Sequence, residues 1–157
     1  MAEQEILSND DMARLVMDIF DKHLPFNRFI GLEVDKSDLS KARIVLPWQD
    51  SLMGNPFHKI LHGGATSAIL DTVGGLMAML HAVKDAQPMT REEFRQRMAN
   101  IGTIDMRVDY LRPGKGESFI ATAEVIRKGN KVAVCRMELH NQDGTHIAFG
   151  TGTYMMS

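Results

Sequence analysis

The segment from Leu61 to Thr66, which reads LHGGAT, is the part of the chain best suited to binding a carbonyl oxygen. It lies where a loop meets a long apolar stretch, and the first turn of a helix there would have backbone N–H groups without partners. Gly63 and Gly64 let a ligand approach these groups closely, and the helix dipole favours negative charge at this end. The segment therefore suggests an oxyanion hole, although two glycines also suit a simple tight turn.

Asp71 is the second candidate, because it is the only acid in that apolar stretch. An ionised carboxylate in apolar surroundings is unfavourable unless it is paired or functional. Asp71 could attack an activated acyl group or deprotonate a water molecule beside it. A structural pairing with a strand hydroxyl or an arginine is the alternative.

Gly63 and Asp71 are eight residues apart, which corresponds to about 12 Å along a helix axis at 1.5 Å per residue. An oxyanion donor and a base that act on one carbonyl must each lie within about 3 Å of their targets. One helix therefore cannot supply both groups to one site. Two antiparallel copies around a twofold axis would bring Asp71 of one subunit beside Gly63 of the other. The small residues Ala68, Gly74 and Gly75 favour such a close approach of helices.

Other catalytic and metal-binding patterns are absent from the sequence or weak. It has no GxSxG, GxxxxGK[ST] or HExxH motif, and no GxGxxG after a strand. His58 and His62 are four residues apart, but Pro56 and the glycines predict a loop there, so no metal site is predicted. The single cysteine, Cys135, excludes a disulfide framework and is expected in the core.

The hydrophobic pattern predicts an α+β fold in which one long helix is wrapped by a curled antiparallel sheet. We expect a single domain over residues 1–157, with an N-terminal helix at about 10–23 and an inserted helical segment at about 84–100. Asn9 or Asp10 is the expected cap of the first helix, and Thr90 with Glu93 forms a capping-box pattern in the insertion. The expected long helix covers 65–83, a loop covers 49–61, and the expected strands are 32–36, 42–48, 104–110, 118–127, 131–140 and 145–155.

The formal net charge of −2 over 157 residues argues against nucleic acid or an anionic membrane as a partner. Ala65–Val83 is long enough to resemble a membrane span, but Asp71 and the Gly74-Gly75 pair within it indicate a buried core helix instead. The first fifteen residues are acidic and lack a long apolar run, so they do not predict a secretory signal. We therefore expect a cytoplasmic protein.

The stretch HGGATSAILD, residues 62–71, resembles the hotdog-fold acyl-CoA thioesterases, in particular their PaaI-like (phenylacetyl-CoA thioesterase-like) branch. The similarity extends to FIG at 29–31, GNP at 54–56 and DYLRP at 109–113, and it spans about residues 26 to 155. The resemblance implies a hotdog fold and hydrolysis of acyl-CoA to a free acid and coenzyme A, as in fatty acid metabolism. It also implies a homodimer or homotetramer and no cofactor.

The same resemblance implies roles for individual residues. Gly63 matches the glycine whose N–H binds the thioester oxygen, and Asp71 matches the nucleophile or general base from the facing subunit. Asn55 lies near the family's loop residue that contacts the carbonyl, and Thr103 matches a Ser or Thr that positions the carboxylate or water. His62 has either an assisting role or a capping role.

Basic residues near the ends of the last strands are candidates for binding the phosphates of coenzyme A, although solvated charges are also common at strand ends. With the backbone of Gly64, the candidate substrate-binding residues are Arg112, Arg127, Lys128, Gly129 and Lys131.

Two other functions remain open at this level. The first is another hotdog enzyme, a hydratase or dehydratase that uses His62, and the second is a non-catalytic acyl-CoA-binding module. The 12 methionines give a weak preference for medium or long aliphatic acyl groups, because flexible thioethers suit varied chains. The insertion at 84–100 is either a flap over the acyl chain or a surface helix.

Overall fold

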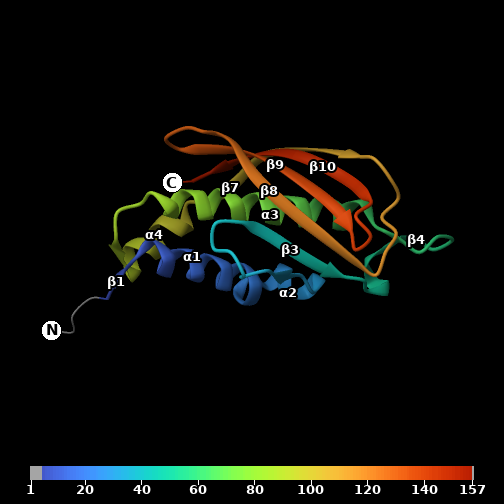
Figure 1. Cartoon of the computed structure of the whole chain (residues 1–157), viewed down its shortest axis with the longest axis horizontal. Helices are drawn as coiled ribbons and strands as arrows, with labels where there is room; N and C mark the ends of the chain where they lie inside the picture. The colour runs from blue at the N-terminus through green and yellow to red at the C-terminus, as the bar shows by residue number, and fades with distance from the viewer. Residues whose placement is uncertain (1–4, 157) are drawn as a thin grey trace.

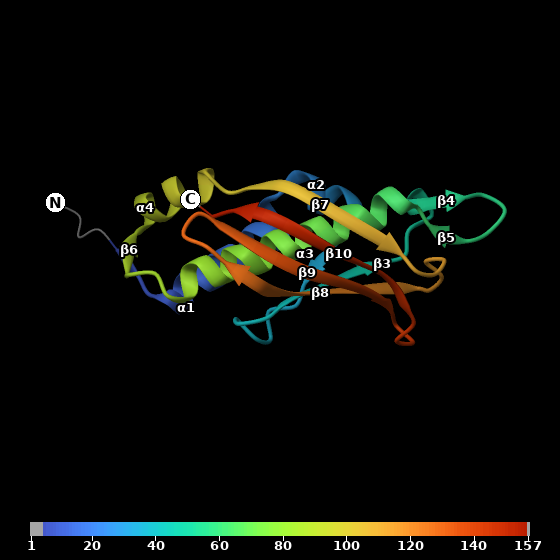
Figure 2. The same cartoon turned by 90° about the horizontal axis from the view of Figure 1, so that it is seen from above.

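The computed structural model describes residues 5–156 and shows a long helix, α3 (Gly63–Lys84), packed against a six-stranded antiparallel sheet (Figures 1 and 2). The strand order is β2-β3-β8-β9-β10-β7. The strands are β2 (Glu33–Val34), β3 (Ala42–Pro47), β7 (Gly102–Tyr110), β8 (Ser118–Lys128), β9 (Val132–Asn141) and β10 (His146–Met155). The predicted α+β class with a central helix is confirmed.

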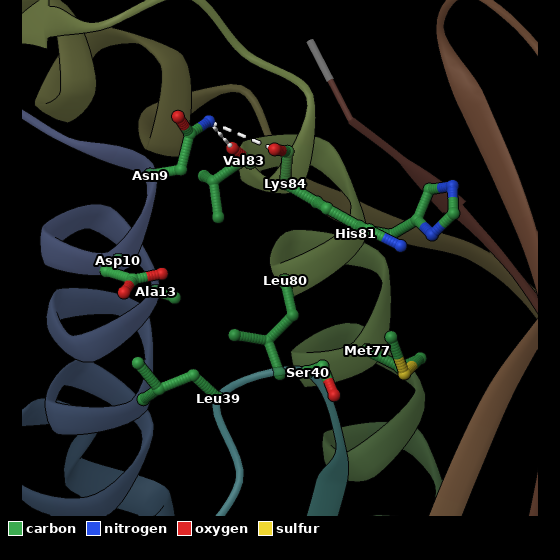
Figure 3. Close-up of a pocket in the computed structure, with 10 residues that line it drawn as sticks. All are labelled: Asn9, Asp10, Ala13, Leu39, Ser40, Met77, Leu80, His81, Val83 and Lys84. Carbon is green, nitrogen blue, oxygen red and sulfur yellow. Dashed lines mark hydrogen bonds between the residues drawn. The ribbon is translucent and has the colours of Figure 1, made fainter.

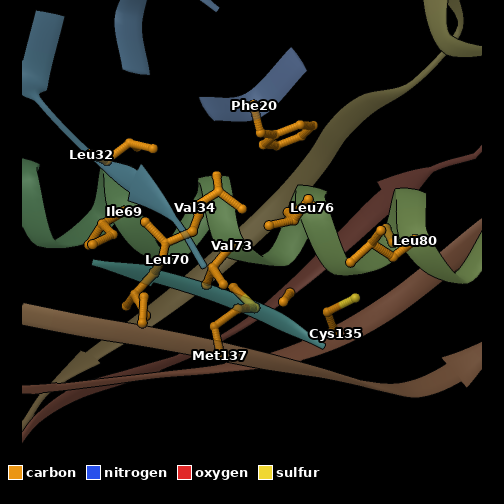
Figure 4. Packing of buried hydrophobic residues seen from close by; sticks show 14 of the residues in the cluster. Phe20, Leu32, Val34, Ile69, Leu70, Val73, Leu76, Leu80, Cys135 and Met137 are labelled. Atoms are coloured by element: carbon orange, nitrogen blue, oxygen red, sulfur yellow. The ribbon is translucent and has the colours of Figure 1, made fainter. Parts of the chain in front are cut away.

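The helix α3 is the core of the fold. By length and composition it could cross a membrane, but 61% of its most apolar 18-residue stretch is buried inside the protein. Figure 4 shows Leu70 and Val73 pointing toward the sheet, where Met137 lies, while Phe20 covers the helix from the opposite side. A helix that is apolar on most faces requires such cover on both sides.

The N-terminal helix is capped differently from the prediction. Ser8, rather than Asn9 or Asp10, forms the capping box of α1 (Asn9–Asp18). Asn9 instead donates its side-chain amide to the last two carbonyls of α3, at 2.7 and 3.0 Å. The prediction was wrong because these acceptors lie more than 70 residues away along the chain.

Beyond Asp18 the helix changes its hydrogen-bond pattern. A π-helix, η1 (Ile19–His23), follows directly, and α2 (Pro25–Ile30) comes after Leu24, whose N–H donates to the Ile19 carbonyl at 3.0 Å. Short π-helical turns are rare and are often found at functional sites. In this protein η1 brings Phe20 against α3.

Two connecting segments are more ordered than predicted. The expected loop at 49–61 contains a 3₁₀ turn, η2 (Asp50–Leu52), and a hairpin of β4 (Met53–Asn55) and β5 (Ile60–Leu61) that projects from the body (Figure 2). In the insertion, β6 (Met89–Thr90) pairs with β1 (Ile6–Leu7), and α4 (Arg91–Ala99) begins with the predicted capping box.

The edge strand β7 has an unusual exposure pattern. It pairs with β10 on one side, and no other strand among residues 5–156 pairs with its other side. Ile104 and Tyr110 on this strand are each more than half exposed. A long edge strand that exposes apolar side chains invites pairing with another chain, and natural proteins usually cover or shield such a strand.

Candidate active site

The N-terminal turn of α3 leaves the backbone N–H groups of Gly63 and Ala65 without acceptors among the described residues. His62 is the N-cap, and its Nδ1 accepts a hydrogen bond from the Gly64 N–H at 2.8 Å. The His62 carbonyl accepts from the Thr66 N–H at 3.1 Å. The Gly63 N–H has no acceptor among the described residues, so it is available to a ligand at the positive end of the helix dipole.

Tyr110 holds this turn in place from the edge strand β7. Its hydroxyl donates to the Gly63 carbonyl at 2.8 Å, and it lies 2.5 Å from the Ser67 hydroxyl. Because the Tyr110 proton is directed to Gly63, Ser67 is the donor in the second bond. Sequence reasoning included Tyr110 in the DYLRP similarity but did not select it as a site residue. Its partner Gly63 is 47 residues earlier, and nothing local indicates the contact.

Asn55 lies on the same side of the site as Gly63. The preceding residue, Gly54, packs against the N-cap so closely that a Cβ atom there would lie 2.7 Å from His62 Cα. The Asn55 side-chain oxygen accepts from the Phe57 N–H at 2.9 Å, which closes the turn of the β4–β5 hairpin. His58 lies in this turn rather than on a helix, so His58 and His62 do not share a helical face.

Asp71 and Thr103 form the second part of the site. The Thr103 hydroxyl donates to Asp71 Oδ1 at 2.9 Å across 32 residues of sequence. Asp71 is partly buried, and the Tyr154 hydroxyl donates to its backbone carbonyl at 3.2 Å. Burial and the nearby Asp71 charge raise the pKa of Tyr154, so this hydroxyl remains a donor.

The structure therefore brings the predicted residues together in two groups rather than one. His62 and Gly63 form the start of α3, and Asn55 follows Gly54, which packs on His62, while Asp71 and Thr103 lie about two helical turns further along α3. The distance along the axis is about 12 Å, as the spacing predicts. Within one chain, the free N–H and the carboxylate cannot act on the same carbonyl carbon.

A cavity of about 430 Å³ opens beside Asp71 and Thr103. Its walls are mostly apolar. Ile19, Phe20 and Leu24 come from the N-terminal helices, Gly75 and Met79 from α3, and Met98 from the insertion, and β7 and β10 complete the lining. Part of the 84–100 segment thus covers an apolar cavity that ends at the carboxylate.

The basic residues are divided between the two ends of α3. Arg112 borders a cavity of about 370 Å³ together with Gly63 and Tyr110, and its guanidinium donates to the His146 carbonyl at 3.0 Å. Arg127, Lys128, Gly129 and Lys131 lie instead at the β8–β9 turn, where Lys128 is 4.0 Å from Asp85, just after α3. The 22 residues of α3, about 33 Å, separate the two groups within one chain.

A further cavity, of about 290 Å³, lies between α1 and α3 (Figure 3). Met77 and His81 line it, and at about 100° per residue they point away from Gly75 and Met79. Burial and the neighbouring Lys128 lower the pKa of His81. This cavity contains none of the predicted site residues, so we assign it no catalytic role.

The structure also shows where Cys135 and a set of possible metal ligands lie. Cys135 is fully buried, as predicted, and burial raises the pKa of its thiol to about 12, so it is no nucleophile. Glu138, His140 and His146 are the one group of possible metal ligands among the described residues. They lie on the sheet face away from α3, where Arg136 pairs with Glu138 at 3.6 Å.

Known proteins resemble this chain in sequence and in fold. The sequence model of the thioesterase superfamily matches residues 58–148. The medium/long-chain acyl-CoA thioesterase YigI of Escherichia coli is 42% identical over 96% of this chain and 97% of its own.

Two solved structures are also similar. A Shewanella oneidensis protein, described as related to the thioesterase superfamily, superposes with a TM-score of 0.90 at 49% identity, over 95% of this chain and 97% of that one. The PaaI protein from the phenylacetic acid degradation operon of Escherichia coli has a TM-score of 0.72 at 19% identity and covers 96% of both chains. The second likeness is one of fold alone.

Proposed function

The chain belongs to the thioesterase superfamily, and from this we propose that it is an acyl-CoA thioesterase whose active site is shared by two subunits. The reaction adds water to R–CO–S–CoA and yields the acid R–COOH and the thiol HS–CoA. The observation that carries the proposal is the apolar cavity that ends at the Asp71–Thr103 pair. An acyl chain in this cavity would present its thioester to the carboxylate.

Each group then has one chemical task. The Gly63 N–H stabilises the negative charge that develops on the thioester oxygen. Asp71 either attacks the carbonyl carbon or removes a proton from the water that does so. Thr103 orients the carboxylate through its hydrogen bond, and Tyr110 holds the Gly63 turn. Arg112 beside Gly63 is the best-placed residue for a coenzyme A phosphate.

A second copy of the chain is needed to complete this site. Antiparallel pairing that brings Gly63 of one subunit to Asp71 of its partner puts the twofold axis midway between them, near Ser67. The unpaired edge of β7 and its exposed apolar side chains support this arrangement, because they offer a surface for a second chain. The site residues Thr103 and Tyr110 both lie on this edge strand. We propose a homodimer as the minimum unit and a homotetramer as its further assembly.

The fold also supports proposals for the extent of the domain, its cellular location and its substrates. We treat residues 1–157 as one catalytic domain to which the 84–100 insertion adds a wall of the cavity. The long apolar helix is its core, which supports a cytoplasmic enzyme rather than a membrane protein. The name of the YigI relative, a medium/long-chain enzyme, and the apolar cavity support medium or long acyl chains as substrates.

One observation argues against the hydratase or dehydratase alternative. That chemistry needs a histidine with a free lone pair as general base, and Nδ1 of His62 accepts the Gly64 N–H, which leaves Nε2 as the nitrogen that carries the proton. A thiol-release assay with acyl-CoAs of increasing length, plus an aryl-CoA, tests the proposal. Enoyl-CoA turnover without free thiol would contradict it, and so would tight acyl-CoA binding without any hydrolysis.

Mixing two inactive variants tests the shared site. In heterodimers of Asp71→Asn and Gly63→Pro, one of the two sites combines the native Gly63 of one subunit with the native Asp71 of the other. After random exchange, half of the dimers are mixed and carry one intact site, so about a quarter of the wild-type activity should return. Absence of recovery, with heterodimers shown by native mass spectrometry, would refute a shared site.

Thr103→Val should lower kcat about tenfold with little change in KM, because a hydrogen bond to a charged group contributes about 1.5–3 kcal/mol and Thr103 is exposed. Steady-state kinetics of thiol release measures both constants. Thr103→Ser keeps the hydroxyl and should retain most of the activity. Equal losses in the two variants would show that the hydroxyl does not position Asp71.

A further inference from the structure

Gly74 and Gly75 are adjacent in the middle of α3, and the structure explains the lack of a side chain differently at each position. Glycine within a helix is unfavourable compared with alanine, so each one calls for a cause. At Gly74 the cause is packing, because an added Cβ atom would lie 2.6 Å from Cζ of the buried Tyr154 ring. This glycine faces the core, so it does not belong to the small-residue surface that the sequence suggested for helix pairing.

Packing within the subunit does not require a glycine at position 75. An added Cβ atom there would lie 3.8 Å from Phe20 Cζ and 3.8 Å from Tyr154 Cε1, which are ordinary van der Waals distances. The α-helical backbone at Gly75 has no positive φ angle that would favour glycine. An alanine would therefore fit at this position and would strengthen the helix.

Close packing between the α3 helices of two subunits does not require a glycine at position 75 either. This step rests on the proposed function, in which the twofold axis lies near Ser67. In that arrangement, position 75 of one subunit faces position 59 of its partner, and α3 starts only at Gly63. In this arrangement the α3 helix of the partner does not reach the position opposite Gly75.

Gly75 lines the same cavity as Asp71. It lies one helical turn beyond Asp71 on the same side of α3, and Met79 follows after one more turn. Phe20 of the π-helix lies across from it, and Met98 of the insertion lines the same cavity. A side chain at position 75 would project between the carboxylate and the far part of the cavity.

We propose that Gly75 determines the acyl-chain length that this enzyme accepts, because its missing side chain lets the chain pass Asp71 and reach Met79 and Met98. The acyl group then lies along α3, with its thioester at Asp71 and its methyl end under the insertion. Gly75 acts on specificity alone, since it has no side chain and its backbone lies in the middle of α3.

Gly75→Leu tests this proposal, with kcat/KM measured for palmitoyl-CoA and for butyryl-CoA. The ratio of the two values should fall by at least about tenfold, because the leucine fills space that only the long chain uses. Met98→Ala enlarges the far end of the cavity and should raise the same ratio. Ser40→Leu adds the same side chain beside the cavity between α1 and α3 and should leave the ratio unchanged.

An unchanged ratio in Gly75→Leu would overturn the proposal, and so would an equal loss with both substrates, which would give Gly75 a role in the site as a whole. Displacement of a fluorescent fatty acid provides a readout that does not depend on hydrolysis. If the wild type releases no thiol, the proposed function fails. Weaker binding of the fatty acid to Gly75→Leu than to Ser40→Leu would still support the inference, and equal binding would overturn it.

Discussion

Replacing Asp71 with asparagine is expected to reduce the kcat for thiol release by about 10²–10⁴-fold, the range usually lost when a general base is removed. Asparagine has nearly the same shape, and its side-chain oxygen can still accept the hydrogen bond from Thr103. What it lacks is the negative charge needed to attack the carbonyl carbon or to take a proton from water. Thiol release at saturating acyl-CoA measures the change.

The melting temperature of Asp71→Asn should stay close to that of the wild type, since the side chain has no salt-bridge partner among the described residues. Asp10→Asn is a matched control, because Asp10 borders the cavity between α1 and α3. It should keep full activity. Near-normal turnover by Asp71→Asn would leave the carboxylate with a structural role only.

Replacing Gly63 with proline is expected to lower kcat by about 10²–10³-fold, the usual cost of losing one oxyanion donor. Position 63 is the first residue of α3, where proline is well tolerated because the N–H makes no bond within the helix. The preceding residue must be extended before a proline, and His62 already has φ −60° and ψ 136°. The substitution thus removes the donor and retains the turn.

Gly63→Ala separates the loss of the N–H from the added bulk. Its Cβ atom would lie 3.5 Å from Tyr110 Cε1, an ordinary contact, and the N–H remains. We expect Gly63→Ala to keep much of the activity that Gly63→Pro loses, while both variants melt at similar temperatures. If alanine and proline were equally damaging, shape rather than the N–H would matter at this position.

Local patterns were sufficient for the long helix and the four longest strands of the fold. The alternation in β7 to β10 predicted four strands near their observed positions, because the side chains of a half-buried strand alternate between core and solvent. The apolar composition of α3 predicted a core helix, because a helix that is apolar on most faces has to be buried. The capping box at Thr90 involves residues three apart, so sequence alone could show it.

Predictions that depended on distant partners were less successful. Asn9 looks like a helix cap, but it bonds to the end of α3, and the 49–61 loop forms a projecting hairpin. The change to a π-helix at Ile19 has no marker in the residue types. In each case, a tertiary contact decides between local conformations of similar free energy.

The candidate site also combines features that follow from local sequence with contacts that depend on tertiary packing. The free donors at the start of a helix and the separation of about 12 Å between Gly63 and Asp71 follow from the order of the residues, because helical rise depends on residue number alone. The bond from Thr103 to Asp71, the bond from Tyr110 to Gly63 and the apolar cavity beside Gly75 arise only when the elements pack. Those contacts join segments more than 30 residues apart, and their positions depend on how all the elements pack together.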